Sequence, residues 1–317
     1  MRTRIPFVVL AVAFACTFAT APAYARARVF VASYGNDSNP CTFGSPCRNF
    51  QQAVDAVDAG GEVTAIDSAG FGPITITKAV TITSPDGVEA GIVPTAGAAI
   101  IINAGASDAV VLRGLTLNGA GVGANGILFN SGGSLTVTNC VVQNFEAEGI
   151  SIQLETSTTV YFVIINTLIS NSRLYGIEYH AANFSKATGV IDHVVVTGGQ
   201  NGIALNGGEL TNGSATDVAI SNSVVSNNSI EGIFAGNGSV LTASIDNTTV
   251  NGNGTGIHAA TPATVRLSRS VIQGNGTGTV NNTNPANTFY TYGNNLIASN
   301  GTDFGGTTPL NTTDTLH

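Results

Sequence analysis

Charged residues are scarce in this sequence, and lysine is nearly absent. Charged side chains make up 9% of the 317 residues, whereas an ordinary globular domain has about 25%. The only lysines are Lys78 and Lys186, and the formal net charge is −8. This acidic balance argues against nucleic acid or an anionic membrane surface as a partner. A polyanionic substrate would need a local basic cleft or a bridging cation.

Several motifs that would indicate a function are also missing. The sequence contains no zinc-ligand spacing, calcium-repeat motif, phosphate-binding loop or Ser-His-Asp signature. Beyond the N-terminus, no segment is long and apolar enough to cross a bilayer, which needs about 20 apolar residues. We therefore predict no resident metal or cofactor and no membrane-spanning segment. No sequence feature specifies the oligomeric state.

The first 25 residues have the pattern of a cleaved secretory signal peptide. Arg2 and Arg4 precede an apolar run over residues 5–15, and an Ala-Tyr-Ala site ends at Ala25. Lipidation at Cys16 is the alternative to cleavage after Ala25. Cleavage would remove two of the 11 basic residues and none of the 19 acidic ones, which makes the mature net charge −10. We expect a periplasmic or fully secreted protein.

Three cysteines remain after the predicted cleavage site. Cys41 and Cys47 flank a turn-rich spacer of five residues. In an oxidising compartment this spacing predicts a disulfide that pins the N-terminal cap. Cys140 is left over, and we interpret it as a half-buried thiol in a strand, because no acid–base partner lies near it in the sequence.

A repeat of 22 to 29 residues runs through the chain. Two motifs recur once in each repeat at a nearly constant distance from each other, and each motif forms a column when the repeats are aligned. The first column is an apolar, any, Asn-like, small, apolar pattern, with central residues Gly114, Asn139, Asn166, His193, Asn222, Asn247, Arg269 and Asn294. The second column is a Gly-Ile pair at 126–127, 149–150, 176–177, 202–203, 232–233 and 256–257. Between these columns lie short β-branched runs, which are typical of strands.

The period predicts an all-β fold, a single-stranded right-handed parallel β-helix solenoid of about nine or ten coils. Strands about 4.8 Å apart would pair their backbones with the coils above and below. We expect the Gly-Ile isoleucines to stack inside, with each glycine supplying the freedom of a tight corner. The Asn column predicts a structural ladder at an inward-facing bend, formed by Asn139, Asn166, His193, Asn222, Asn247 and Asn294. Arg269 is too long to lie inside, and we expect it to turn outward.

The chain is predicted to be one domain with capped ends. Residues 26–60 would form an N-terminal cap with the disulfide loop and a short helix, opened by Ser45-Pro46 and running through 49–57. This helix would cover the open first coil. Residues 61–297 would form the β-helix, and residues 298–317 a loose C-terminal tail.

The chain resembles the right-handed parallel β-helix, or pectin-lyase-like, superfamily. The residues that carry the resemblance are the opening segment 31–41, the segment 46–50 and the segment 70–82. They are similar to a group of exported bacterial β-helix repeat proteins whose activity is mostly unassigned. The resemblance implies the fold over nearly all of the chain after Ala25. It says little about chemistry, because one fold carries many functions.

The resemblance also implies where a site would lie, on the strand that begins with Gly-Ile. Lyases of the superfamily need a carboxylate cluster for calcium and an Arg or Lys base, and the glycosidases need an acid–base pair of aspartates. The outward positions of this strand offer no lysine and no carboxylate cluster, so calcium is expected only if the protein is a lyase. Glu178 and His180 are the best catalytic candidates. The candidate binding residues are Ser151, Gln153, Asn206 and His258.

The preferred hypothesis is an exported solenoid that binds carbohydrate or a surface partner along a flat polar face. The alternative is a polysaccharide lyase or glycoside hydrolase that uses Glu178 and His180. An adhesin or passenger fragment is a third interpretation with less support.

Overall fold

The computed structural model describes residues 26–154, 159–181, 185–207, 215–237, 240–283 and 288–312. The predicted signal peptide, residues 1–25, lies outside the described residues. No helix in the described ranges is long and apolar enough to cross a membrane.

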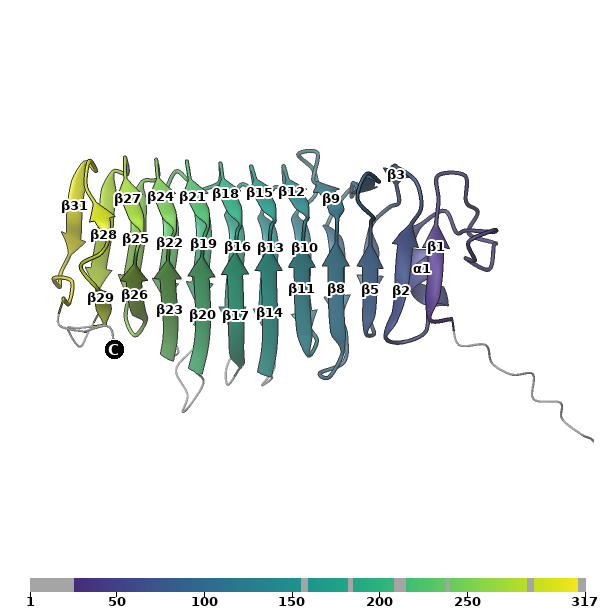
Figure 1. The fold of residues 1–317 in the computed structure, drawn as a ribbon, viewed down its shortest axis with the longest axis horizontal. Helices are drawn as coiled ribbons and strands as arrows, with labels where there is room; N and C mark the ends of the chain where they lie inside the picture. Colours follow the sequence, from purple (N-terminus) through teal and green to yellow (C-terminus); the bar gives the residue numbers. More distant parts are fainter. Residues whose placement is uncertain are drawn as a thin grey trace, which may run out of the picture.

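The described chain forms a rod of stacked coils whose strands make three parallel sheets (Figure 1). Sheet 1 consists of β1 (Arg28–Val31), β2 (Gly61–Ala65), β5 (Val80–Thr83), β8 (Ala109–Arg113), β11 (Ser134–Thr138), β14 (Thr159–Ile165), β17 (Lys186–Asp192), β20 (Ala215–Ser221), β23 (Val240–Asp246), β26 (Thr264–Ser268) and β29 (Phe289–Thr291). Sheet 2 consists of β4 (Ile74–Ile76), β7 (Ala98–Asn103), β10 (Asn125–Ser131), β13 (Glu148–Leu154), β16 (Tyr175–Ala181), β19 (Asn201–Asn206), β22 (Glu231–Gly236), β25 (Thr255–Ala260), β28 (Thr277–Asn282) and β31 (Thr302–Gly306). Sheet 3 consists of β3 (Ala69–Gly70), β6 (Ala90–Ile92), β9 (Leu115–Asn118), β12 (Val141–Gln143), β15 (Leu168–Ser170), β18 (Val195–Thr197), β21 (Val224–Ser226), β24 (Thr249–Asn251), β27 (Val271–Gln273) and β30 (Leu296–Ile297).

Each repeat contributes one strand to each sheet and pairs with the next repeat, which confirms the predicted parallel β-helix. Sheets 2 and 3 hold ten strands each and sheet 1 holds 11, in agreement with the prediction of nine or ten coils. The Gly-Ile isoleucines stack as predicted: Ile127, Ile150, Ile177, Ile203, Ile233 and Ile257 pair in register, and each is at most 1% exposed.

The glycine before each isoleucine has a different role from the one predicted. None of these six glycines has a positive φ. At Gly149, a Cβ would lie 2.7 Å from the carbonyl oxygen of Gly176 and 2.5 Å from Cγ2 of Ile169, a buried side chain of sheet 3. Glycine is needed here because the coils approach too closely for any side chain, not because the corner requires special backbone angles.

The predicted asparagine column lies on the outer surface, so the expectation that it faces inward was wrong. Asn139, Asn166, His193, Asn222 and Asn247 have left-handed φ values between 46° and 55°, and they and Asn294 are exposed. Arg269 shares this geometry, with a φ of 48°. In this conformation the side chain turns away from the rod, and the following residue turns inward. Those following residues are Cys140, Thr167, Val194, Ser223, Thr248 and Ser270, which are all buried.

A second asparagine column, which the sequence analysis did not identify, is the buried ladder. Asn228, Asn253 and Asn275 are at most 3% exposed, and Asn300 continues their line. The Nδ2 of Asn228 donates to Oδ1 of Asn253 at 2.9 Å, and the Nδ2 of Asn253 donates to Oδ1 of Asn275 at 3.0 Å. The ladder ends at Asp303, whose Oδ1 accepts from Asn300. A carboxylate has no donor with which to extend the ladder further.

The N-terminal end is closed by helix α1 (Phe50–Ala56), which buries Phe50, Ala53 and Val54. The helix is shorter than predicted and begins after Pro46, because Ser45 and Cys47 form isolated bridges with Thr42 and Val31 instead. The predicted Cys41–Cys47 disulfide is present.

The boundaries of the solenoid also differ from the predicted ones. Strand β1 lies in the predicted cap and pairs with β2, and β31 lies in the predicted loose tail and pairs with β28. The solenoid therefore extends past residue 297 in the described chain. Residues 313–317 lie outside the described residues.

The buried ladder yields a stability prediction. Asn253→Ala should lower the free energy of unfolding by about 3 kcal/mol, because it leaves buried amide groups of Asn228 without an acceptor. Urea denaturation followed by far-UV circular dichroism measures this change. The control is Asn247→Gly, which removes an exposed bond to Asn222 and keeps the left-handed backbone. It should cost less than about 1 kcal/mol. Equal losses in the two variants would contradict the assignment of the ladder.

Candidate functional site

The outer face of sheet 2 brings the predicted site residues into rows. One row pairs Leu128, Ser151, Glu178, Ala204, Phe234 and His258 in register, as the sequence predicts. A row two residues further along contains Gln153, His180, Asn206 and Gly236.

A third row, which precedes each Gly-Ile pair, was missed by sequence reasoning. It contains Asn125, and its members Glu148, Tyr175, Asn201, Glu231 and Thr255 pair in register. Strict alternation would place these residues inside, on the same side as the isoleucine two positions later. The glycine breaks the alternation, because a Cβ at this position would point at buried residues of sheet 3. Glycine and isoleucine therefore both face the interior. The residue before the glycine can then reach the surface.

This third row adds two carboxylates, Glu148 and Glu231, to the face that carries Glu178. The negative charges of Glu148, Glu178 and Glu231 all act on the hydroxyl of Tyr175. Its pKa is raised first by partial burial and then by these three carboxylates, with Glu178 the strongest of them. The signal in the sequence was an acidic residue directly before Gly-Ile at positions 148 and 231. No three His, Cys, Asp or Glu side chains among the described residues are grouped so that they could hold a metal ion.

Glu178 is held in place by predicted binding residues. Glu178 is only 9% exposed. Ser151 Oγ donates to Glu178 Oε2 and Asn206 Nδ2 donates to Oε1, each at 3.4 Å. Gln153 Nε2 donates to Ser151 Oγ at 3.1 Å. The structure therefore unites these four residues in one network.

His180 does not join that network. It is exposed, and it makes no hydrogen bond to any part of the chain that the structure describes. The pairing of Glu178 with His180 as catalytic partners stays an untested prediction.

Glu148 is the most perturbed carboxyl group of this face. Burial raises its pKa first, and the negative charge of Glu178 raises it further. The amide of Asn125 donates to Glu148 Oε2 and lowers the pKa in part. Glu148 and Glu178 lie on neighbouring coils, in β13 and β16.

His258 pairs with Glu231 on the same face. Its Nδ1 lies 2.6 Å from Oε1 of Glu231, and its Nε2 lies 3.2 Å from Nδ2 of Asn282. These partners assign the proton to Nδ1, because an amide nitrogen donates to Nε2. The ring also contacts Phe234 edge-on, with centroids 5.3 Å apart.

An open hollow of about 200 Å³ lies between two aromatic residues of this face. Tyr175 and Phe234 stand two coils apart, with the small Ala204 between them. The residues that line the hollow are Tyr175, Asn201, Ala204, Asn206, Glu231, Phe234 and Asn237. The hollow therefore combines two ring faces, three amides and one carboxylate.

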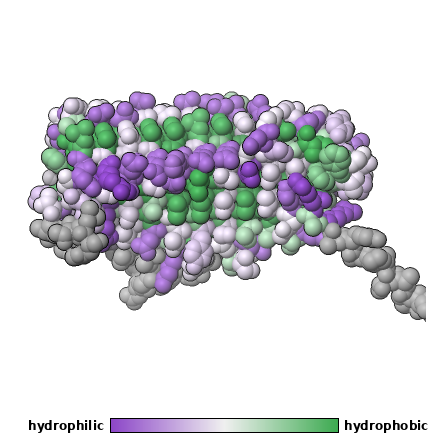
Figure 2. Space-filling view, viewed as in Figure 1, coloured by the Kyte–Doolittle hydropathy of each residue, from purple (hydrophilic) through white to green (hydrophobic). Residues whose placement is uncertain are grey.

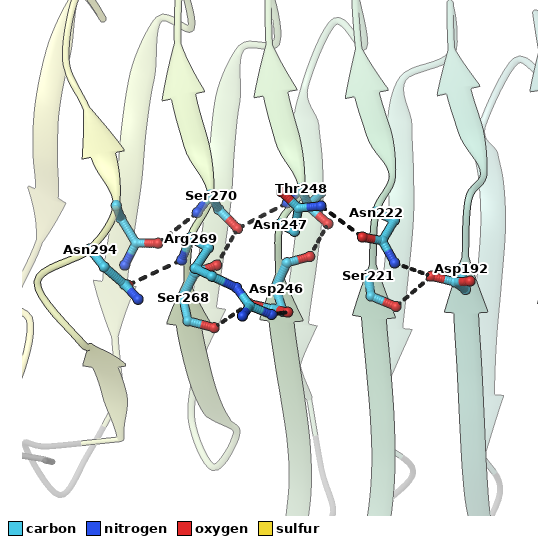
Figure 3. Close-up of polar contacts among 11 residues, drawn as sticks. Asp192, Ser221, Asn222, Asp246, Asn247, Thr248, Ser268, Arg269, Ser270 and Asn294 are labelled. Carbon is cyan, nitrogen blue, oxygen red and sulfur yellow. Dashed lines mark hydrogen bonds and ion pairs between the residues drawn. The ribbon is translucent and has the colours of Figure 1, made fainter. Parts of the chain in front are cut away.

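The outer asparagine column forms a separate polar ridge between sheets 1 and 3 (Figure 3). Asp192 Oδ1 accepts from Ser221 Oγ and Asn222 Nδ2, both at 2.7 Å, and Asn247 donates to Asn222. These bonds and His193 hold the pKa of Asp192 at about 2, with the bond from Ser221 the largest cause. Further along, Arg269 pairs with Asp246. An open hollow of about 210 Å³ on the ridge is lined by Asp246, Ser268, Arg269 and Asn294.

Comparisons with known proteins support the fold and leave the chemistry open. No protein-family model matches the chain, and no curated protein matches it. Among solved structures, the chain is similar to the crystal structure of pectate lyase Pel9A, with a TM-score of 0.57 and 16% identity over 92% of this chain and 78% of that one. A rhamnogalacturonan lyase is also similar, with a TM-score of 0.42 and 10% identity over 87% of this chain and 83% of that one. Likeness at this identity shows the parallel β-helix fold alone.

The effect of the Glu178 charge on the pKa of Glu148 can be tested directly. Glu178→Gln should lower the pKa of Glu148, because it removes the negative charge that disfavours ionisation of Glu148. Asn125→Ala should raise the same pKa, because it removes a donor to the carboxylate. Titration of the side-chain carboxyl carbons by NMR measures both changes. An unchanged Glu148 pKa in Glu178→Gln would show that the two groups do not face each other.

Proposed function

We propose that this chain is an exported solenoid that binds a neutral polysaccharide along the outer face of sheet 2. The observation that carries the proposal is the hollow between Tyr175 and Phe234, lined by amides. Aromatic faces contact the apolar faces of sugar rings, and amides bond their hydroxyl groups. The open shape of the hollow suits a chain that continues along the rod. The disulfide Cys41–Cys47 supports export, because such bonds persist in oxidising compartments.

Charge supports a neutral ligand over an acidic one. Glu148, Glu178 and Glu231 lie on the same face, and no lysine or arginine occurs in β10, β13, β16, β19, β22 or β25. A polyuronate would be repelled by these carboxylates. Pectate, the substrate named for the similar lyase, is therefore not the ligand we propose.

The binding proposal predicts that the two aromatic residues dominate affinity. Tyr175→Ala and Phe234→Ala should each weaken binding by about 2 kcal/mol, or roughly 30-fold in Kd, because each removes a ring that borders the hollow. Affinity gel electrophoresis against neutral glucans, mannans and xylans, followed by titration calorimetry, measures the change.

The matched control is Tyr161→Ala, which removes a tyrosine that is 56% exposed on sheet 1. It should leave the affinity unchanged. Equal losses from Tyr161→Ala and Tyr175→Ala, or stronger binding to pectate than to any neutral polymer, would contradict the proposal.

A glycoside hydrolase is the second candidate function, and the position of Glu148 and Glu178 on neighbouring coils of one face favours it. A glycosidase needs one protonated and one ionised carboxyl on the same face. The raised pKa of Glu148 suits the proton donor. Glu178, whose carboxylate oxygens accept from Ser151 and Asn206, is the partner that we assign as base or nucleophile. In this mechanism Glu148 protonates the leaving oxygen while Glu178 activates water or attacks the sugar carbon.

The hydrolase candidate predicts new reducing ends from a neutral polysaccharide. Glu148→Gln and Glu178→Gln should each lower the rate by about 100-fold or more, whereas His180→Ala should retain activity. Binding without new reducing ends would leave the non-catalytic proposal in place. A rate that falls with His180→Ala as far as with Glu178→Gln would instead favour the pairing predicted from the sequence.

A further inference from the structure

His258 contacts two of the residues that line the hollow without lining the hollow itself. It lies on β25, the neighbour of β22, in register with Phe234. Its Nδ1 lies 2.6 Å from Oε1 of Glu231, and its ring meets the ring of Phe234 edge-on. Glu231 and Phe234 are both lining residues of the hollow. One side chain on the neighbouring coil therefore holds both a carboxylate and an aromatic ring of the hollow.

The imidazole of His258 is itself held on its other side. Asn282, on β28, places its Nδ2 3.2 Å from Nε2 of His258. An amide nitrogen can only donate, so Nε2 is the acceptor and Nδ1 carries the proton that is donated to Glu231. The side chains of His258 and Glu231 are 21% and 19% exposed. Their bond is thus largely shielded from water, where a hydrogen bond to a carboxylate is stronger.

This bond leaves the second carboxylate oxygen of Glu231 available to a ligand. Oε1 is occupied by His258, and Oε2 accepts no hydrogen bond from any residue that the structure describes. Glu178 differs, because both of its oxygens accept from neighbouring side chains. Glu231 is also the carboxylate that lines the hollow, whereas Glu148 and Glu178 do not. The hollow therefore contains one charged acceptor whose position is fixed.

We propose that His258 is a positioning residue for the hollow and that Glu231 is the acceptor that it presents to a hydroxyl group of the bound sugar. The inference rests on the proposed binding function and adds the group that the hollow recognises. His258 donates to Oε1, and Oε2 accepts from a hydroxyl of the sugar ring that packs against Phe234. A hydrogen bond to a carboxylate is roughly twice as strong as one between neutral groups, so this contact orients the sugar more than the amides do.

Two substitutions separate the two contacts of His258. His258→Asn keeps a donor, because the amide nitrogen of asparagine is bonded to Cγ as Nδ1 is in histidine, but it loses the ring. His258→Phe keeps a ring beside Phe234 and loses the donor. Titration calorimetry of the full chain with cellohexaose, mannohexaose and xylohexaose measures the Kd. His258→Phe and Glu231→Gln should each weaken binding of the tightest of these probes about 10-fold, and His258→Asn less than about threefold.

A double variant tests whether His258 acts through Glu231. His258→Phe combined with Glu231→Gln should bind the same probe within about twofold of Glu231→Gln alone, because both substitutions remove the same positioned acceptor. Losses that add in full would contradict the positioning role.

The matched control is His193→Asn. His193 also places Nδ1 against a carboxylate, 2.7 Å from Oδ2 of Asp192. It lies on the polar ridge, the hydrophilic band that runs along the rod in Figure 2. Its left-handed backbone, with a φ of 51°, suits asparagine. This variant should leave the Kd of each probe unchanged, and circular dichroism checks that every variant is folded.

The tautomer of His258 gives a readout that needs no sugar. NMR of the ring nitrogens in mildly alkaline buffer should show His258 protonated at Nδ1 and bare at Nε2, with its signals identified by their absence in His258→Asn. A ring that is bare at Nδ1, or a His258→Phe variant that binds as tightly as the unchanged chain, would overturn this inference and leave the proposed function in place. If the unchanged chain bound none of the three probes, the proposed function and the role of Glu231 would both be refuted.

Discussion

The structure depends on one constraint, the parallel backbone pairing of each coil with the next. Every coil must return its chain to the same place about 4.8 Å further along the rod. Positions that repeat in the sequence therefore stack as columns, and a residue type that suits one coil suits its neighbours. The isoleucine column and the buried ladder through Asn228, Asn253 and Asn275 both follow from this pairing. The ladder satisfies polar groups that would otherwise be buried without partners.

The same constraint gives each of the three faces its own chemistry. Sheet 2 gathers carboxylates and aromatic rings from successive coils, because Glu148, Tyr175 and Glu231 occupy one row. Sheet 3 carries only neutral residues, and the bend between sheets 1 and 3 carries the polar ridge (Figure 3). A solenoid can thus carry different chemistry on each face, because the faces share a core but no side chains.

Two errors of sequence interpretation have the same physical cause, the local breakdown of alternation at a corner. Asn139, Asn166 and Asn222 were expected inside, but a left-handed backbone turns them outward and turns the next residue inward. At the Gly-Ile corner two successive residues face the interior, which carries Tyr175 to the surface. Within a strand, alternation of apolar and polar residues predicts whether a side chain faces the interior or the solvent. The sequence pattern does not show the backbone angles at the corners.

The sequence by itself determined the fold, because two columns that keep step through six repeats can be satisfied only by stacked parallel coils. It also determined the disulfide Cys41–Cys47 and the register of the row through Ser151, Glu178 and His258. Only the tertiary structure decided which residues meet across coils. Glu148 and Glu178 are 30 positions apart, and the tertiary structure places them on neighbouring coils of one face. Periodicity fixes which coil a residue belongs to, whereas the corner geometry fixes which way its side chain points.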